Sequence, residues 1–355
     1  MNMKKQRFKQ FKRNFIILVF FLLVLTPLTA QIDKDDYVYD FAWGNGMFVA
    51  VGKSGSLGFI SYSVDGKTWT KVTDNTFLNY KINKEDKYES QTREIYSVAW
   101  GNGKFVAVGE NLVAYSADGK KWTRVANTER YIFCSVAWGN GKFVTSTDDN
   151  YWRIMYSFDG EIWRMVYDDA GKGDYQSGLV WKRFFGRGGD YNYQLIRYTT
   201  VSWGNGRWVM YNPSYGMGYS TDGEIWTWIT GQRSRFGSIN AVVCGSGKWV
   251  AVGNSGQMFY SVDGQIWTSI NSPFGLTSIL SVTYGNGKWV AIGAAPNPLI
   301  YYSNDGKTWI QVPLDDDFDE LFYVSDRKVI FGNIVFCGNK FFISVKGNIY
   351  TLNLE

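Results

Sequence analysis

Apolar and polar residues alternate along the chain in short runs, and turns rich in glycine separate the runs. In the best-defined stretch the apolar run Ile95–Gly101 is followed by Asn102-Gly103 and then by a second run, Lys104–Gly109. Asn-Gly between two such runs indicates a β-hairpin, because both residues tolerate the positive φ of a type I′ turn. Two further runs, Leu112–Ser116 and Trp122–Val125, follow. The pattern therefore predicts four short antiparallel strands in succession.

This pattern is repeated along the chain. The phrase V-A-W-G-N-G-K-F-V-A-V-G is complete at Val98–Gly109, and its variants start at Phe41, Val136, Val201, Val242, Val282 and Ile334. A second phrase, S-x-D-G-x-x-W, follows each of the first six copies, at Ser63–Trp69, Ser116–Trp122, Ser157–Trp163, Ser220–Trp226, Ser261–Trp267 and Ser303–Trp309. A period of roughly 40–60 residues with β-rich copies indicates a propeller or another array. Four strands in each of seven copies predict an all-β fold, a seven-bladed β-propeller of four-stranded antiparallel blades.

The seventh copy differs from the others. Its segment Phe331–Leu352 lacks the second phrase and has room for only three good strands. Residues Gln31–Asp36 are barely long enough to add a fourth strand that would close the ring. We therefore expect the last blade to be incomplete.

The phrase S-x-D-G-x-x-W resembles the Asp-box, or bacterial neuraminidase repeat, which occurs in sialidases and in many propellers that are not enzymes. In that family the box is the turn between the third and fourth strands of a blade, and it has the same place here. The family's usual box has one more residue between the aspartate and the aromatic residue, so the boxes of this chain are a shortened form. The resemblance covers about residues 37–351 and implies the fold, whereas one fold of this kind hosts many activities.

The residues of the box have a structural role. An Asp or Ser side chain can accept hydrogen bonds from the backbone of its own turn, and the Gly supplies backbone freedom. The Trp then buries its large ring between neighbouring blades. We predict that the aspartates cap their turns, and calcium or ligand binding is the alternative, for Asp65, Asp118, Asp159, Asp222, Asp263 and Asp305.

The N-terminus has the features of a targeting segment. Six cations precede an apolar stretch from Phe15 to Leu25, and a small residue, Ala30, follows shortly after it. A secretory signal peptide has a basic region, an apolar run of about 7–15 residues and a small residue at the cleavage site. We expect residues 1–30 to be removed and residues 31–355 to form a single β-propeller domain that is secreted, periplasmic or on the cell surface. An uncleaved anchor is the alternative, and only in that form is membrane contact expected.

Charge and composition exclude several functions. The chain has 37 lysines and arginines against 32 aspartates and glutamates, and the leader holds six of the cations and no anion, which leaves the mature chain nearly neutral. The basic pI is therefore no evidence for nucleic-acid binding. The absence of histidine removes the commonest metal ligand and general base. Cys134, Cys244 and Cys337 stand at unrelated positions of the repeat, as isolated thiols do. We assign no metal, cofactor or catalytic residue.

Insertions into the repeat fall on one face of the predicted propeller. In an up-and-down blade the first and third connections share a face, and here these are the short Asn-Gly turns and the Asp-boxes. The second connection and the link to the next blade emerge on the opposite face, and these carry all the long insertions, which are Thr73–Glu94, Thr145–Trp152, Tyr167–Arg197, Tyr211–Met217 and Pro313–Val329. Insertions confined to one face of a repeat protein often mark its binding face.

The longest insertion, Tyr167–Arg197, mixes aromatic residues with arginines, which is the composition of recognition hot spots. With its neighbours along the chain it predicts a ligand-binding patch of Asp149, Trp152, Trp181, Arg183, Arg187, Arg197, Tyr211 and Tyr215. The arginines would bind an anionic group, and a tryptophan would stack on a ring or fill a pocket of a partner. The alternative is that this insertion packs on the propeller as a cover.

The choice of function lies between a binding protein and an enzyme. Sialidases of this resemblance carry an arginine triad and an F-R-I-P phrase ahead of the first box, but nothing before Ser63 matches the phrase and no arginine lies between Ala30 and Ser63. We therefore expect a monomeric, non-catalytic propeller that binds a glycan or protein partner through the face with the insertions. The alternatives are a sialidase-like glycoside hydrolase and an assembly factor for a membrane protein complex, a role of similar propellers in photosynthetic membranes.

Overall fold

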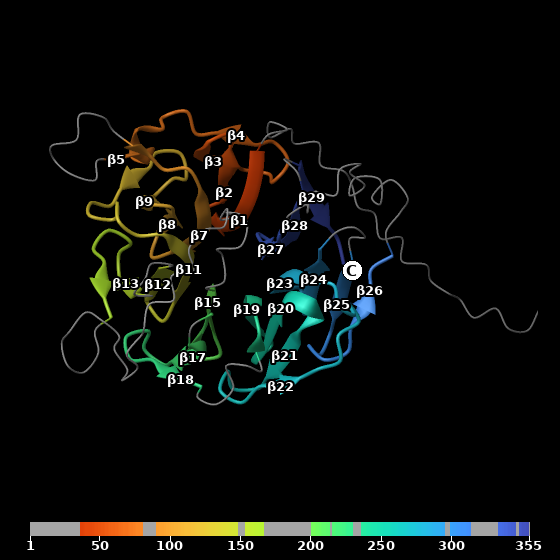
Figure 1. Cartoon of the computed structure of the whole chain (residues 1–355). Coiled ribbons are helices and arrows are strands. Elements are labelled where there is room, and N and C mark those ends of the chain that lie inside the picture. Colours follow the sequence, from red (N-terminus) through yellow and green to blue (C-terminus); the bar gives the residue numbers. More distant parts are fainter. Residues whose placement is uncertain are drawn as a thin grey trace, which may run out of the picture.

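The structure of the protein is a computed structural model. It describes residues 36–80, 90–147, 153–166, 200–213, 215–229, 236–294, 299–313, 333–345 and 348–354. These residues form seven antiparallel sheets arranged around a common axis, as Figure 1 shows. The predicted seven-bladed β-propeller is thereby confirmed.

Each blade begins with the strand nearest the axis, and the following strands lie progressively outward (Figure 1). The first strands are β1 (Asp36–Gly44), β7 (Ile95–Gly101), β11 (Phe133–Gly139), β15 (Thr200–Gly204), β19 (Ile239–Gly245), β23 (Ile279–Gly285) and β27 (Asn333–Cys337). The second strands are β2 (Met47–Ser54), β8 (Lys104–Gly109), β12 (Lys142–Thr147), β16 (Arg207–Asn212), β20 (Lys248–Gly253), β24 (Lys288–Gly293) and β28 (Lys340–Val345).

The outer strands complete the blades. The third strands are β3 (Leu57–Ser63), β9 (Leu112–Ser116), β13 (Ile154–Ser157), β17 (Gly216–Ser220), β21 (Met258–Ser261), β25 (Ile300–Ser303) and β29 (Asn348–Leu352). The fourth strands are short: β4 (Thr70–Lys71), β10 (Thr123–Arg124), β14 (Arg164–Met165), β18 (Thr227–Trp228), β22 (Thr268–Ser269) and β26 (Ile310–Gln311). Within the described ranges the seventh blade has three strands, as its missing box predicts.

Among the described residues, two short 3-10 helices and one small hairpin lie outside the blades. The helices are η1 (Thr76–Leu78) and η3 (Asn254–Gly256), and the hairpin pairs β5 (Asn79–Tyr80) with β6 (Ser90–Gln91). In the described part of the chain no helix is long and apolar enough to cross a membrane.

The hairpin turns have the geometry that their sequence requires. Asn102 and Gly103 have φ values of 46° and 75°, so both occupy the left-handed region of a type I′ turn. The glycine before the turn has a different role, because it makes room for the next blade. A Cβ atom on Gly101 would lie 2.0 Å from Cδ2 of Trp138, which comes from the equivalent place in the third blade. The phrase V-A-W-G thus encodes contact between successive blades as well as a strand.

Side chains at one inner position also tie the blades together. Asp40, Ser97 and Ser135 have equivalent registers on β1, β7 and β11. The carboxylate of Asp40 accepts hydrogen bonds from the Ser97 hydroxyl at 2.7 Å and from the backbone N–H of Val98 at 3.0 Å. The Ser97 hydroxyl in turn accepts from the backbone N–H of Val136. A chain of polar contacts therefore runs from blade one to blade three close to the axis.

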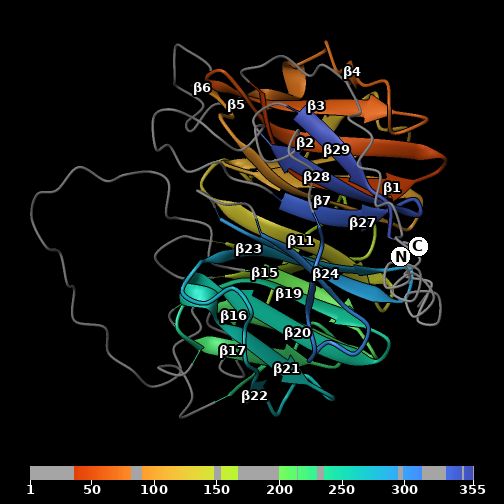
Figure 2. The same ribbon diagram turned by 90° about the vertical axis from the view of Figure 1, so that its right-hand side faces the viewer.

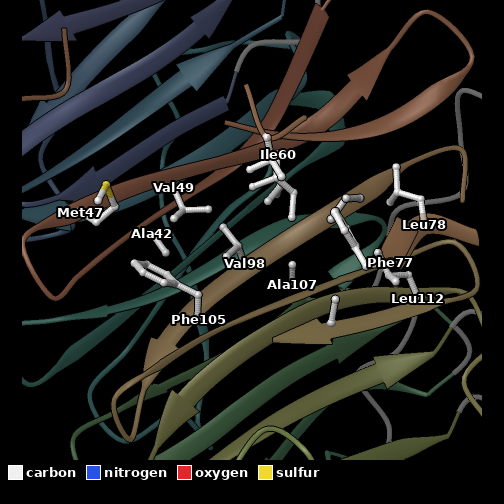
Figure 3. Close-up of a cluster of buried hydrophobic side chains, with 14 residues drawn as sticks. Ala42, Met47, Val49, Ile60, Phe77, Leu78, Val98, Phe105, Ala107 and Leu112 are labelled. Carbon is white, nitrogen blue, oxygen red and sulfur yellow. The ribbon is translucent and has the colours of Figure 1, made fainter. Parts of the chain in front are cut away.

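The core is divided into clusters between neighbouring blades. Figure 3 shows the cluster between blades one and two, where Val49 and Ile60 face Phe105 and Leu112. Phe77, which belongs to the first insertion, is buried in the same cluster. The start of this insertion is therefore built into the propeller.

The ring closes through side chains at the seam between blades seven and one. Phe342 of β28 is fully buried, and its ring lies 5.4 Å from that of Phe41, 5.2 Å from Phe48 and 6.2 Å from Trp69, measured between centroids. The Asn333 side chain donates a hydrogen bond to the carbonyl of Tyr39 across the same seam.

Candidate functional site

The two faces of the propeller differ in how their turns are built. The Asn-Gly hairpin turns and the boxes lie on the same side of the propeller. Two contacts between the hairpin of blade two and the box of blade three show this: the Asn102 side chain donates to the carbonyl of Phe158 at 3.0 Å, and Lys104 forms an ion pair with Glu161. We call this side the box face. The opposite side, where the second strand joins the third and one blade joins the next, is the insertion face. Figure 2 gives the side view in which the strands run between these two faces.

The boxes show the predicted capping geometry. In the second blade Asp118 accepts hydrogen bonds from the backbone N–H groups of Lys120 and Lys121, both at 2.8 Å, and from the hydroxyl of Ser116. The same three contacts recur in the other five boxes. The pKa of Asp118 lies below its usual value, because these hydrogen bonds to the carboxylate outweigh the effect of partial burial. Each Asp-box carboxylate is thus engaged by its own turn.

Most of the predicted ligand-binding residues lie outside the described residues, namely Asp149, Trp152, Trp181, Arg183, Arg187 and Arg197. Tyr211 lies at the end of β16, is only 2% exposed, and donates its hydroxyl to the carbonyl of Gly237. Tyr215 is half-buried in the connection to β17, and its ring lies 5.1 Å from that of Trp228. These two tyrosines therefore support the insertion face from within blade four, and a role of the patch in binding stays a prediction.

Sequence reasoning missed one cation and one tyrosine on the insertion face. Arg153 stands directly before β13, and its guanidinium lies 5.3 Å from the centroid of the Tyr131 ring. The backbone N–H of Arg153 donates to the hydroxyl of Thr147, which fixes the arginine at the end of blade three. Tyr131 belongs to the link between blades two and three, where no insertion drew attention. The sequence feature that could have identified Arg153 is its position directly after Trp152, where the insertion Thr145–Trp152 ends.

A pair of tyrosines lies nearer the axis, on the first strands of blades one and two. Tyr39 and Tyr96 occupy β-bulges at the start of β1 and β7, and their ring centroids are 6.1 Å apart. A bulge re-aims a side chain out of the regular pleat. Both tyrosines are partly exposed. We call Tyr39, Tyr96 and Tyr131, which lie at the insertion-face ends of blades one, two and three, the tyrosine row, and this row with Arg153 is the candidate site.

A cluster of charged groups lies at the start of β7, just before Tyr96 in the chain. Arg93 is exposed next to Glu94, whose carboxylate forms an ion pair with Lys53 at 3.0 Å. Glu110 lies close by, and partial burial raises its pKa, while Arg93 acts in the opposite direction. The site thus offers aromatic surfaces together with charges of both signs, which suits a polar peptide backbone and its side chains.

The Asp40 carboxylate lies on the inner strand of blade one, one residue after Tyr39. Burial raises its pKa to about 6, although hydrogen bonds from Val98, Ser97 and Phe41 favour the charged form. The folded protein therefore binds the carboxyl proton of Asp40 more tightly than the unfolded chain does, since an aspartate in an unfolded chain has a pKa of about 3.9. Asp40 stabilises the fold most at low pH, and this contribution is lost as the pH rises through about 6.

We expect the Asp40→Asn variant to lose this pH dependence, because its amide does not titrate. When the pH is lowered from 7.5 to 5, the melting temperature of the parent should rise relative to that of the variant. The boxes do not disturb the comparison, because their lowered pKa values place their titration below this window. Parallel profiles of melting temperature against pH, recorded by circular dichroism, would show that the Asp40 pKa is not raised.

Comparisons with known proteins identify the fold. No protein-family model and no curated protein matches the chain. Among solved structures, YCF48 bound to D1 peptide has 15% sequence identity, covers 94% of this chain and 95% of its own, and superimposes with a TM-score of 0.59. Virginiamycin B lyase from Staphylococcus aureus has 13% identity, covers 94% of this chain and 100% of its own, and has a TM-score of 0.64.

A third similar structure, the GH74 enzyme of Niastella koreensis, has 15% identity and a TM-score of 0.53 over 89% of this chain and 43% of its own. A peptide-bound protein, a lyase and another enzyme thus share the propeller with this chain. At these identities the likeness concerns the fold alone, and the Asp-box assignment rests on the motif. Function has to be argued from the site.

Proposed function

We propose that the protein is a non-catalytic propeller that binds a segment of a partner protein on its insertion face. The observation that carries the proposal is the stacking of Arg153 on Tyr131, on the same face of the propeller as the ring pair of Tyr96 and Tyr39. Tyrosine and arginine are enriched among the residues that dominate protein interfaces. Here they stand on a rigid scaffold, where binding residues are commonly presented by loops and strand ends.

The chemistry of the row favours a peptide over a small anion. Lys53 is paired with Glu94, Arg93 lies close to the carboxylate of Glu110, and Arg153 lies over the ring of Tyr131. Mixed charges and aromatic faces match the alternating polar and apolar groups of an extended chain. A propeller of the same fold, YCF48, is seen with a bound peptide, which makes this mode of use feasible for the fold. The predicted patch around Trp152 and Trp181 would extend the same surface.

The other functions weighed from the sequence give different results in simple assays. A sialidase-like hydrolase would release the fluorophore from a fluorogenic sialoside, whereas we expect no turnover above a buffer blank. A lectin would give a sharp hit on a glycan array. An assembly factor for an envelope or membrane complex is a special case of the proposed function, in which the bound segment belongs to one subunit.

The proposal is tested with a phage-displayed library of linear peptides and the exported protein. We expect a peptide family to be enriched, and Arg153→Ala should weaken its binding by about tenfold or more, which is the effect of a modest hot spot. The matched control is Arg164→Ala, because Arg164 is exposed on β14 and also lies over a ring, that of Phe158, but on the box side. Equal losses in the two variants, or no enriched peptide, would contradict the proposal.

A further inference from the structure

The box face is divided into two chemically different parts. In blades one, two and six a lysine follows the glycine of the box, whereas in blades three, four and five a glutamate or glutamine stands there and is followed by isoleucine. The lysines are Lys67, Lys120 and Lys307, and the isoleucines are Ile162, Ile225 and Ile266. The three isoleucine boxes are consecutive around the ring, and lysine boxes adjoin them on both sides.

The isoleucine boxes expose an unusual amount of apolar surface. Nine large apolar side chains are exposed among the described residues, and five of these lie in the boxes of blades three to five: Phe158, Ile162, Ile225, Val262 and Ile266. The isoleucines are 66%, 73% and 71% exposed. We call these five residues the apolar arc. Apolar groups gathered on one face of a soluble protein mark an interaction surface.

The turns that carry the apolar arc are rigid. The backbone N–H groups of Ile162, Ile225 and Ile266 each donate to the aspartate of their own box, at 2.8 to 2.9 Å. Each of these boxes is also bound to the hairpin of the preceding blade, by Asn102, Asn140 and Arg207 respectively. The backbone that carries the exposed side chains is therefore held in place before any partner binds, which reduces the entropy lost on binding.

The carboxylates around the apolar arc each have a partner within the protein. Glu161 and Glu224 form ion pairs with Lys104 and Lys142, and the box aspartates are engaged by their turns. The exposed Lys67, Lys120, Lys121 and Lys307 take part in no ion pair with another described residue. The apolar arc thus lies between Lys120 and Lys121 of blade two and Lys307 of blade six, and none of these lysines forms an ion pair with a described carboxylate.

We propose that the apolar arc and the lysines beside it bind the surface of an anionic lipid bilayer. Apolar side chains enter the boundary between headgroups and acyl chains, and lysines near an anionic surface add an attraction that salt weakens. The boxes have the same length in six blades, which presents their tips as a broad surface and not as a pocket. The proposal concerns the box face and does not depend on peptide binding by the insertion face.

The test uses vesicles of phosphatidylcholine alone and of phosphatidylcholine with about one third phosphatidylglycerol. The protein is purified from the exported fraction, so that every variant carries the same N-terminus. We expect flotation with the anionic vesicles and little with the neutral ones. The triple change Ile162→Thr, Ile225→Thr and Ile266→Thr copies the chain's own boxes one and six and should lower binding by at least about tenfold.

A second variant tests the charges. Lys67→Gln, Lys120→Gln and Lys307→Gln copy the glutamine of box five and should abolish the preference for anionic vesicles and its dependence on salt. Failure of the parent to float with anionic vesicles would overturn the proposal, and so would unchanged flotation of the isoleucine variant. If the parent binds no vesicles and sediments as a dimer, while the variant with the three isoleucines replaced sediments as a monomer, the apolar arc binds a second copy of the chain and not a membrane. Circular dichroism melting confirms that both variants fold.

Discussion

Replacement of Gly101 by valine is expected to unfold the protein at ordinary temperatures. The first carbon of any side chain at this position would lie 2.0 Å from Cδ2 and 2.2 Å from Cγ of Trp138, well inside van der Waals contact. Because both residues lie on inner strands of neighbouring blades, relief would require the two blades to separate. Overpacking of this kind in a dense interior costs several kcal/mol when the backbone cannot yield, which is a large share of the about 5–15 kcal/mol that stabilises an ordinary domain.

The control for this prediction is two residues away. Gly103 has a φ of +75°, and no atom lies within 4 Å of the place that a Cβ atom would take, so Gly103→Ala meets strain from its backbone conformation only. That strain amounts to about 1–2 kcal/mol. Urea unfolding followed by tryptophan fluorescence should therefore find the Gly103 variant folded and the Gly101 variant unfolded. Similar stabilities for the two variants would mean that the blades do not meet at Trp138.

Phe342→Ala is expected to destabilise the protein by about 3–5 kcal/mol, which is the usual cost of deleting a buried aromatic side chain. Its ring is fully buried and contacts Phe41, Phe48 and Trp69 of blade one. These contacts close the ring between the last blade and the first. We therefore expect the variant to open at this seam before it unfolds elsewhere.

Hydrogen exchange measures the seam directly. In Phe342→Ala the amides of β1 and β27 should exchange faster, while those of blades three and four keep their protection. Phe341→Ala is the matched control, because Phe341 is equally buried but packs with Phe336 on the side of blade six. Identical exchange patterns in the two variants would contradict the role of Phe342 in closure.

The repeat phrases were sufficient to predict the architecture, because each phrase encodes a local structure with its own physical cause. Asn-Gly requires a tight turn, and the box supplies its own capping groups. The contact between Gly101 and Trp138 was less visible in the sequence, since it joins residues that lie one repeat apart. It explains in retrospect why the first strand ends on a glycine in six copies of the repeat.

The candidate site could be predicted only as a face of the propeller. The insertions indicated that face, but Arg153 and Tyr131 come from different connections, and only the fold brings their side chains together. Tyr39 and Tyr96 stand inside the repeat and looked like strand residues, whereas a bulge turns each of them out of the pleat. Tyr211 shows the opposite case, because a residue that seemed part of an insertion is buried at the end of a strand.

Site-specific photo-crosslinking in cells that naturally make the protein tests most directly whether the insertion face binds a protein. A benzoylphenylalanine replaces Tyr131 on the insertion face in one sample and the exposed Thr68 on the box face in another. The account predicts a discrete crosslinked protein at position 131 and none at position 68. A protein adduct at position 68 alone, or none at either position, would contradict it.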